Sequence, residues 1–183
     1  MIFFGGVPKS GALLHRKLTI MEKTVMKPMN VGLLGLGTVG GGTLTVLRRN
    51  AAEITRRAGR EIRVTMAAAR DLDKAKHYAS AGLMLTDNPF AVVDNLDIDI
   101  VVEMMGGISP AKELILRAIE NGKHVVTANK ALIANHGTEI FAAAQKKVVV
   151  VAFEAAVGGG YGNNKKLCSV ACGEMRRPKI LTM

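Results

Sequence analysis

Met29-Asn30-Val31-Gly32-Leu33-Leu34 runs directly into Gly35-Leu36-Gly37-Thr38-Val39-Gly40, and this junction decides the fold of the chain. The first six residues are typical of a buried strand, and the next six have the spacing G-x-G-x-x-G. Glycine at 35 permits a tight turn, glycine at 37 leaves the backbone open to a diphosphate, and glycine at 40 allows close helix packing. Free amides and the positive end of the helix dipole then face the diphosphate. The alternative is a loop that serves packing alone.

An amphipathic helix is predicted after the glycine turn. Its apolar residues recur at steps of three and four, which places them on one face: Leu44, Leu47, Ala51, Ile54 and Ala58. Arginines and Glu53 occupy the remaining surface, and Gly59 is a plausible stop. We interpret this charged stripe as a solvated helix face.

Strand-like and helix-like stretches alternate over the rest of residues 29–157. The predicted strands cover 62–69, 83–86, 98–103, 124–127 and 148–154. The predicted helices cover 71–81, 90–95, a stretch from Ser109-Pro110 to Asn121-Gly122, and 132–146. Continuous β-branched strands separated by helices predict an α/β fold with a Rossmann-type doubly wound parallel sheet. Ligands of such sheets bind beyond the carboxyl ends of the strands.

Length and charge limit the remaining possibilities. The chain has 183 residues, room for one domain with a real core, and a net charge of +10. Residues 1–30 and 158–183 each carry five basic residues against one acidic residue, so the basicity belongs to the two ends. We expect an irregular extension over 1–28, a dinucleotide-binding domain over 29–157 and a disordered tail over 158–183.

Composition also argues against two kinds of partner. Without tryptophan and with only two tyrosines, the chain lacks stacking platforms, so we expect no nucleic-acid partner. No apolar run approaches the ~20 residues that span a bilayer, so we expect no membrane partner. The only cysteines, Cys168 and Cys172, suggest neither a zinc site nor a disulfide framework, which makes a reducing cytoplasmic location the default.

Four segments, in order and at natural spacing, resemble homoserine dehydrogenase over about residues 31–157. They are Gly35–Gly40, Val101-Val102-Glu103 with Gly106-Gly107, Val126-Thr127-Ala128-Asn129-Lys130-Ala131-Leu132, and Phe153-Glu154-Ala155-Ala156-Val157. The resemblance implies an oxidoreductase that interconverts aspartate 4-semialdehyde and homoserine with NAD(P)H, in threonine, methionine and isoleucine biosynthesis. It also implies a homo-oligomeric enzyme with a small-molecule substrate.

The resemblance and the glycine turn together predict the cofactor-binding residues, which are Gly35, Leu36, Gly37, Thr38, Val39, Gly40, Arg70, Lys74, Gly107, Thr127 and Lys130. Arg70 follows the second predicted strand, where the adenosine ribose lies. An acidic residue there accepts from the 2′-hydroxyl of NAD, whereas an arginine accommodates the 2′-phosphate of NADP. Arg70-Asp71 leaves both open, and nearby Lys74 favours NADP. A surface arginine that begins a helix is the structural alternative.

The resemblance places Lys130 in the active site as the catalytic lysine. Its ammonium group could polarise the aldehyde oxygen and supply a proton. Thr127 and Asn129 are expected to shape the loop by side-chain hydrogen bonds to the backbone. We assign Glu103 to hydrogen bonding near the cofactor loop rather than to general base catalysis. His124 and His136 are expected to be structural.

The last matching segment resembles the family loop that binds a monovalent cation, such as sodium, through backbone carbonyls. Its predicted ligands are Glu154, Val157 and Gly159. The resemblance ends abruptly after Gly160, which predicts a fragment or a reading-frame change, and a chain that is nearly inactive alone. Two alternatives stay open: a non-catalytic NAD(P)-binding module or pseudogene product, and a dehydrogenase of another short aldehyde or amino acid.

Overall fold

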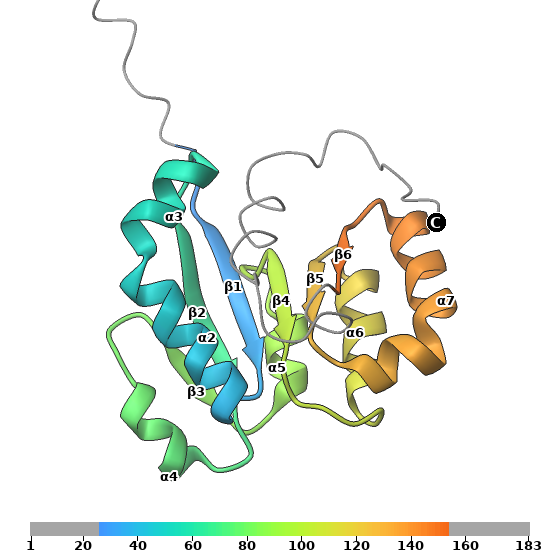
Figure 1. The fold of residues 1–183 in the computed structure, drawn as a ribbon, viewed down its shortest axis with the longest axis horizontal. Coiled ribbons are helices and arrows are strands. Elements are labelled where there is room, and N and C mark those ends of the chain that lie inside the picture. Colours follow the sequence, from blue (N-terminus) through green and yellow to red (C-terminus); the bar gives the residue numbers. More distant parts are fainter. Residues whose placement is uncertain (1–25, 154–183) are drawn as a thin grey trace, which may run out of the picture.

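A computed structural model describes residues 26–153, and these residues form one six-stranded sheet with helices on both faces (Figure 1). All strand pairs are parallel, in the order β3-β2-β1-β4-β5-β6. The strands are β1 (Met29–Leu34), β2 (Ile62–Ala68), β3 (Met84–Thr86), β4 (Ile100–Glu103), β5 (His124–Thr127) and β6 (Val151–Ala152). The predicted doubly wound, Rossmann-type sheet is confirmed.

The helices divide between the two faces of the sheet. One face carries α2 (Thr38–Arg49), α3 (Ala51–Ala58), α4 (Leu72–Ala75) and the 3₁₀ helix η1 (Lys76–Tyr78). The opposite face carries α5 (Pro89–Asp94), α6 (Ala111–Glu120) and α7 (Lys130–Lys147). Each helix connects two parallel strands, as a crossover requires.

The burial of the central strand β1 explains why its sequence is apolar apart from Asn30. Val31 and Leu33 point into the core beneath α2 and α3, and Leu34 points into the core beneath α5 and α6. A Cβ on Gly32 would lie 2.5 Å from Cγ1 of Val92, so α5 packs directly on the strand backbone. Both faces of the strand are therefore buried, which removes the polar alternation of a half-exposed strand.

The strand register brings several loops to one edge of the sheet. Leu34 lies beside Ala68 of β2 and Glu103 of β4, and Glu103 lies beside Thr127 of β5. The carboxyl ends of these strands therefore meet at the lower edge in Figure 1. The strand order reverses direction between β1 and β4, which is the switch point where open α/β sheets bind ligands.

Asn50 divides the predicted single helix in two. Its backbone N–H and its side-chain amide both donate to the carbonyl of Val46, which ends α2, and its own carbonyl accepts from Ile54 to begin α3. Ala51, predicted on the buried face, is exposed directly after this break, while Leu44, Leu47, Ile54 and Ala58 are buried.

Other boundaries also differ from the predicted ones. The helix predicted over 71–81 is only α4 followed by η1, because Asp71 caps the start and the chain leaves helical geometry at Ala79. Of the strand predicted over 148–154, the described residues 148–153 form only β6, because Val148 ends α7 in the left-handed region at φ 56°. α7 begins at Lys130, two residues before the predicted start, because Asn129 caps it.

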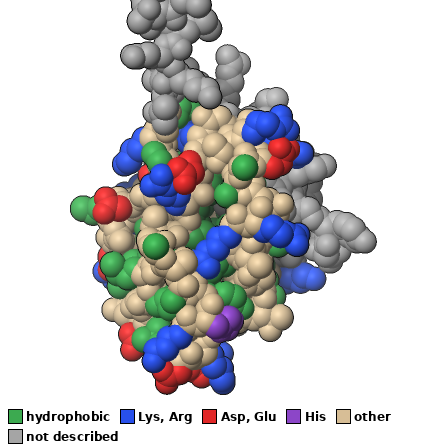
Figure 2. All heavy atoms as spheres, turned by 90° about the vertical axis from the view of Figure 1, so that its left-hand side faces the viewer, with side chains coloured by type: hydrophobic (Ala, Val, Ile, Leu, Met, Phe, Trp, Pro, Cys, Tyr) green, Lys and Arg blue, Asp and Glu red, His purple; other side chains and the backbone are tan. Residues whose placement is uncertain are grey.

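Charged side chains of both signs are mixed on the face shown in Figure 2. Neighbours pair within α3, at the start of β2 and between α4 and η1, for example Arg56 with Glu53 at 2.7 Å and Lys76 with Asp73 at 2.6 Å. Such exposed pairs contribute little to stability.

Between residues 26 and 153, no helix has both the length and the apolar character needed to cross a membrane.

His124 joins the start of β5 to the chain entering β6. Its Nδ1 accepts a hydrogen bond of 3.1 Å from the backbone N–H of Val150, so this nitrogen must be unprotonated. Burial lowers the pKa of His124 from 6.5, and Asp99 opposes this shift. The structural role predicted for His124 is confirmed.

We therefore expect the fold to weaken as pH falls below about 6.5, since the unfolded histidine takes up a proton that the folded one resists. Urea unfolding at about pH 7.5 and about pH 5.5 measures this loss. The variant His124→Asn keeps a side-chain acceptor but does not titrate, so its loss over the same interval should be smaller. Equal losses in both proteins would contradict the assignment.

Candidate functional site

Two glycines of the turn between β1 and α2 occupy positions that disfavour any side chain. Gly35 has φ 99°, and its N–H donates to the carbonyl of Ala68 at 2.9 Å. A Cβ on Gly40 would lie 1.8 Å from the carbonyl oxygen of Gly35, a distance that no side chain can tolerate. The predicted roles of these two glycines, in the turn and in close packing, are consistent with this geometry. At residue 40 the close contact is with the backbone of Gly35 in the turn.

Gly37, in contrast to Gly35 and Gly40, has space for a side chain. It is the N-cap of α2, it makes no side-chain capping bond, and a Cβ built on it would meet nothing within 4 Å. The first N–H groups of a helix have no partner within the helix. The amides at the start of α2 therefore border open space, as anion binding at a helix N-terminus requires.

Arg70 lies just beyond β2, on the same edge of the sheet. It is exposed, and within residues 26–153 its guanidinium forms no hydrogen bond or ion pair. Asp71 is already engaged, because it accepts from the Lys74 amide at 3.0 Å and pairs with the Lys74 ammonium at 3.1 Å. These two contacts, the amide first, hold the pKa of Asp71 below its usual value.

Glu103 anchors the loop that follows β4. Its side chain is fully buried, and its Oε1 accepts from the N–H groups of Met105 at 2.8 Å and Gly106 at 3.2 Å. Its Oε2 accepts from the Thr127 hydroxyl at 2.6 Å. Three donors offset the cost of burying a carboxylate. The hydrogen-bonding role assigned to Glu103 is confirmed.

Asn129 connects the loops after β4 and β5. Its side-chain amide donates to the carbonyl of Gly107, and its Oδ1 accepts from the Leu132 N–H at 3.1 Å. Its own N–H donates to Oγ1 of Thr127 at 3.0 Å. Thr127 and Asn129 thus shape the loop through backbone hydrogen bonds, as the sequence predicted.

Lys130 is the first residue of α7, directly after Asn129. Its side chain is exposed and has no hydrogen bond or ion pair to the part of the chain that the structure describes. The backbone beneath it is rigid, because Asn129 caps the helix. Lys130 therefore presents, at the carboxyl edge of the sheet, an ammonium group that has no partner among the described residues. Its backbone is held by the capped start of α7.

The sheet thus brings together the glycine turn, Arg70, Gly107, Thr127 and Lys130 at one edge. The predicted cation ligands Glu154, Val157 and Gly159 lie outside the described residues. Sequence reasoning missed the bond between Glu103 and Thr127 and the clamp from Asn129 to Gly107. Only the register of β4 and β5 could have indicated these contacts.

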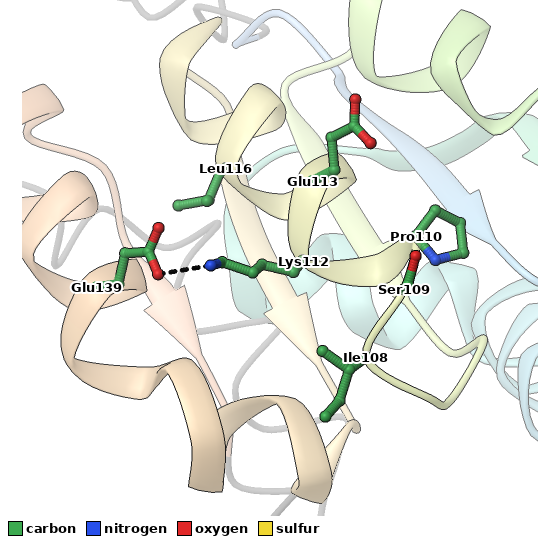
Figure 3. A pocket seen from close by; sticks show the side chains of 7 residues that line it. All are labelled: Ile108, Ser109, Pro110, Lys112, Glu113, Leu116 and Glu139. Atoms are coloured by element: carbon green, nitrogen blue, oxygen red, sulfur yellow. Dashed lines mark ion pairs between the residues drawn. The ribbon is translucent and has the colours of Figure 1, made fainter.

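A separate hollow of about 320 Å³ lies on the outer side of α6 and α7 (Figure 3). The side chains of Ile108, Pro110 and Leu116 give it an apolar lining, and Lys112 pairs with Glu139 across it at 2.8 Å. None of the residues predicted to bind the cofactor lines this hollow.

Two glycines of α2 provide a matched test of the turn. We expect Gly40→Ala to lower the free energy of unfolding by about 1–3 kcal/mol, because the methyl group must displace the Gly35 carbonyl. Gly42 is also helical, but its Cβ would meet nothing within 4 Å, so Gly42→Ala should raise stability by about 0.5–1 kcal/mol. Chemical denaturation measures both. Effects of the same sign would contradict the packing described.

The buried network can be tested at Thr127. Thr127→Val keeps the shape but removes a donor to Glu103 and an acceptor for Asn129, so we expect a loss of about 1–3 kcal/mol in unfolding free energy. Thr127→Ser keeps the hydroxyl and should lose less. A valine variant that unfolds at the same urea concentration as the wild type would show that these bonds contribute nothing.

Comparison with known proteins also identifies a dinucleotide-binding domain in this chain. The family model for the NAD binding domain of homoserine dehydrogenase matches residues 35–154. Homoserine dehydrogenase of Pseudomonas aeruginosa is 60% identical over 136 residues, which cover 74% of this chain and 31% of that protein. The Neisseria gonorrhoeae enzyme is 56% identical over 135 residues, with the same coverage of 74% and 31%.

A solved structure agrees with the fold. The homoserine dehydrogenase of Thiobacillus denitrificans is 72% identical and superposes with a TM-score of 0.69, covering 72% of this chain and 30% of that one. The chain thus spans less than a third of the length of these relatives. The predicted family is confirmed, because the family model covers most of this chain: it belongs to the homoserine dehydrogenases, and residues 35–154 match their NAD binding domain.

Proposed function

We propose that residues 26–153 bind NAD(P)H through the glycine turn and serve as the cofactor-binding part of a homoserine dehydrogenase. The observation that carries this proposal is the contrast between Gly37 and Gly40. At Gly40 the Gly35 carbonyl fills the place that a Cβ would take, whereas the space beside Gly37, at the amides of α2, is open. A diphosphate fits there because it supplies the acceptors that these N–H groups lack.

The same edge of the sheet supports NADPH as the preferred form. Among the described residues Arg70 is a cation beyond β2 without an ion pair, and Asp71 contacts the amide and the ammonium group of Lys74. A 2′-phosphate would gain a charge-assisted contact from Arg70, and the Lys74 ammonium adds positive charge nearby. A 2′-hydroxyl would have to share the Asp71 carboxylate with Lys74. We therefore propose that NADPH binds more tightly than NADH.

Lys130 is proposed as the catalytic residue for the interconversion of aspartate 4-semialdehyde and homoserine. The bound cofactor supplies or accepts the hydride. The Lys130 ammonium would donate a hydrogen bond to the aldehyde oxygen, stabilise the negative charge that develops on it and supply the proton that completes the hydroxyl group. Asn129 and Thr127 keep the start of α7 fixed, so the lysine backbone does not reorganise during the reaction.

Two further expectations belong to this proposal. We propose that the 183 residues alone bind the cofactor without appreciable turnover, because the matched region is the NAD binding domain. Glu154, Val157 and Gly159 are proposed to hold a monovalent cation. The competing candidate, a module that binds NAD(P) without catalysis in any context, differs in its prediction for a longer chain: joined to the rest of a relative, it stays inactive.

Gly37→Ala separates cofactor binding from folding. The added methyl meets nothing within 4 Å, so the unfolding free energy should stay close to that of the wild type. The dissociation constants of NADPH and NADH should both rise by about tenfold or more, because the methyl occupies the place of the diphosphate. Calorimetric titration of the 183-residue chain, with homoserine oxidation assayed in parallel, measures binding and turnover.

A wild-type chain that binds neither nicotinamide coenzyme would overturn the proposed function. An alanine variant that binds both as tightly as the wild type would place the diphosphate elsewhere. Gly42→Ala is the control, since it adds the same methyl group to the exposed side of α2.

A further inference from the structure

The segment that carries Arg70 and Lys74 has little stability of its own. It connects β2 to β3 through α4, with four residues, and η1, with three. Isolated helices shorter than about 12 residues are marginal in water, so contacts with the rest of the fold must hold this segment. At its start, the N–H of Ala69 donates to the carbonyl of Thr86 at 2.9 Å.

At its other end, the segment packs on α2 through Tyr78. A Cβ built on Gly41 would lie 1.9 Å from the hydroxyl oxygen of Tyr78 and 2.3 Å from its Cζ. Only glycine at residue 41 leaves room for this ring. Within residues 26–153 the hydroxyl makes no hydrogen bond. The contact is therefore one of shape, made by the hydroxyl oxygen and the adjoining end of the ring.

Arg48, two turns further along α2, holds the backbone of the same residue. Its Nη1 donates to the carbonyl of Tyr78 at 2.9 Å, and its Nη2 donates to Oγ of Ser80. α2 thus contacts both the ring and the main chain of Tyr78. Because Gly37 is the N-cap of α2, the same helix contacts both the proposed diphosphate site and the segment that carries Arg70.

We infer that the contact between Tyr78 and Gly41, with Arg48, determines the preference for NADPH by positioning Arg70 and Lys74. This inference rests on the proposed function. Tyr78 is a positioning residue, because it acts through the cations and not on the cofactor. A 2′-phosphate needs those cations at a fixed place, whereas a 2′-hydroxyl does not. Displacing Tyr78 therefore weakens NADPH binding more than NADH binding.

The experiment measures dissociation constants of NADPH and NADH for the 183-residue chain and its variants. In Gly41→Ala the ring must move, and we expect NADPH to bind about tenfold more weakly while NADH changes less than about twofold. Tyr78→Ala should have the same effect. Tyr78→Phe keeps the ring and loses only the hydroxyl oxygen nearest to Gly41, so it should weaken NADPH binding less than Tyr78→Ala does.

Two combinations test whether these residues act together. Gly41→Ala with Tyr78→Ala should be no weaker for NADPH than either single variant, because both remove one contact. Arg70→Ala should lower NADPH affinity in the wild type but have little further effect on top of Gly41→Ala. Gly42→Ala is the matched control and should leave both constants unchanged.

The results distinguish the inference from the proposed function. If the wild type binds neither coenzyme, the proposed function fails, and the inference with it. If the wild type binds both, and Gly41→Ala and Tyr78→Ala weaken both equally or neither, the proposed function stands and the inference is overturned. If Arg70→Ala leaves NADPH affinity unchanged, the inference is likewise overturned. Should Gly41→Ala fail to fold, Tyr78→Ala decides, because it adds no atoms.

Discussion

The absence of a side chain at residue 40 is the constraint on which this site depends. The Gly35 carbonyl occupies the space that a Cβ at residue 40 would need, at 1.8 Å. α2 can therefore begin immediately beyond the end of β1, with its first amides at the edge of the sheet. Nothing larger than hydrogen at this position would allow the turn to be so short. The position of the helix axis, and hence of everything that packs on α2, follows from this contact.

A buried polar network fixes the neighbouring loops. Glu103 receives three hydrogen bonds, two from the backbone of its own loop and one from Thr127. Asn129 then joins the same loop to the start of α7. A carboxylate buried in this way is costly unless it is fully hydrogen-bonded, so the network forms only when both loops are in place. The exposed lysine at residue 130 thereby begins from a rigid backbone.

Some local features could be predicted because their causes are local. The strand at Met29–Leu34 was recognisable because buried parallel strands are apolar on both faces. His124–Thr127 matched its predicted boundaries. The helix break at Asn50 was not predictable from periodicity, because Leu44, Leu47, Ile54 and Ala58 keep a helical spacing across it. The shortness of β6 was not predictable for a similar reason. The residues between the end of α7 and β6, which begin with the C-cap Val148, are as apolar as the strand itself.

The sequence by itself determined the element types, the glycine turn and the residues that end each strand, because these depend on neighbours along the chain. It also determined that Thr127 and Asn129 bond to nearby backbone. Only the tertiary structure decided which strand ends are adjacent, that Glu103 meets Thr127, and that Tyr78 covers Gly41. These contacts join residues 24 and 37 positions apart. Strand register and helix packing bring such residues together, and no local pattern encodes either.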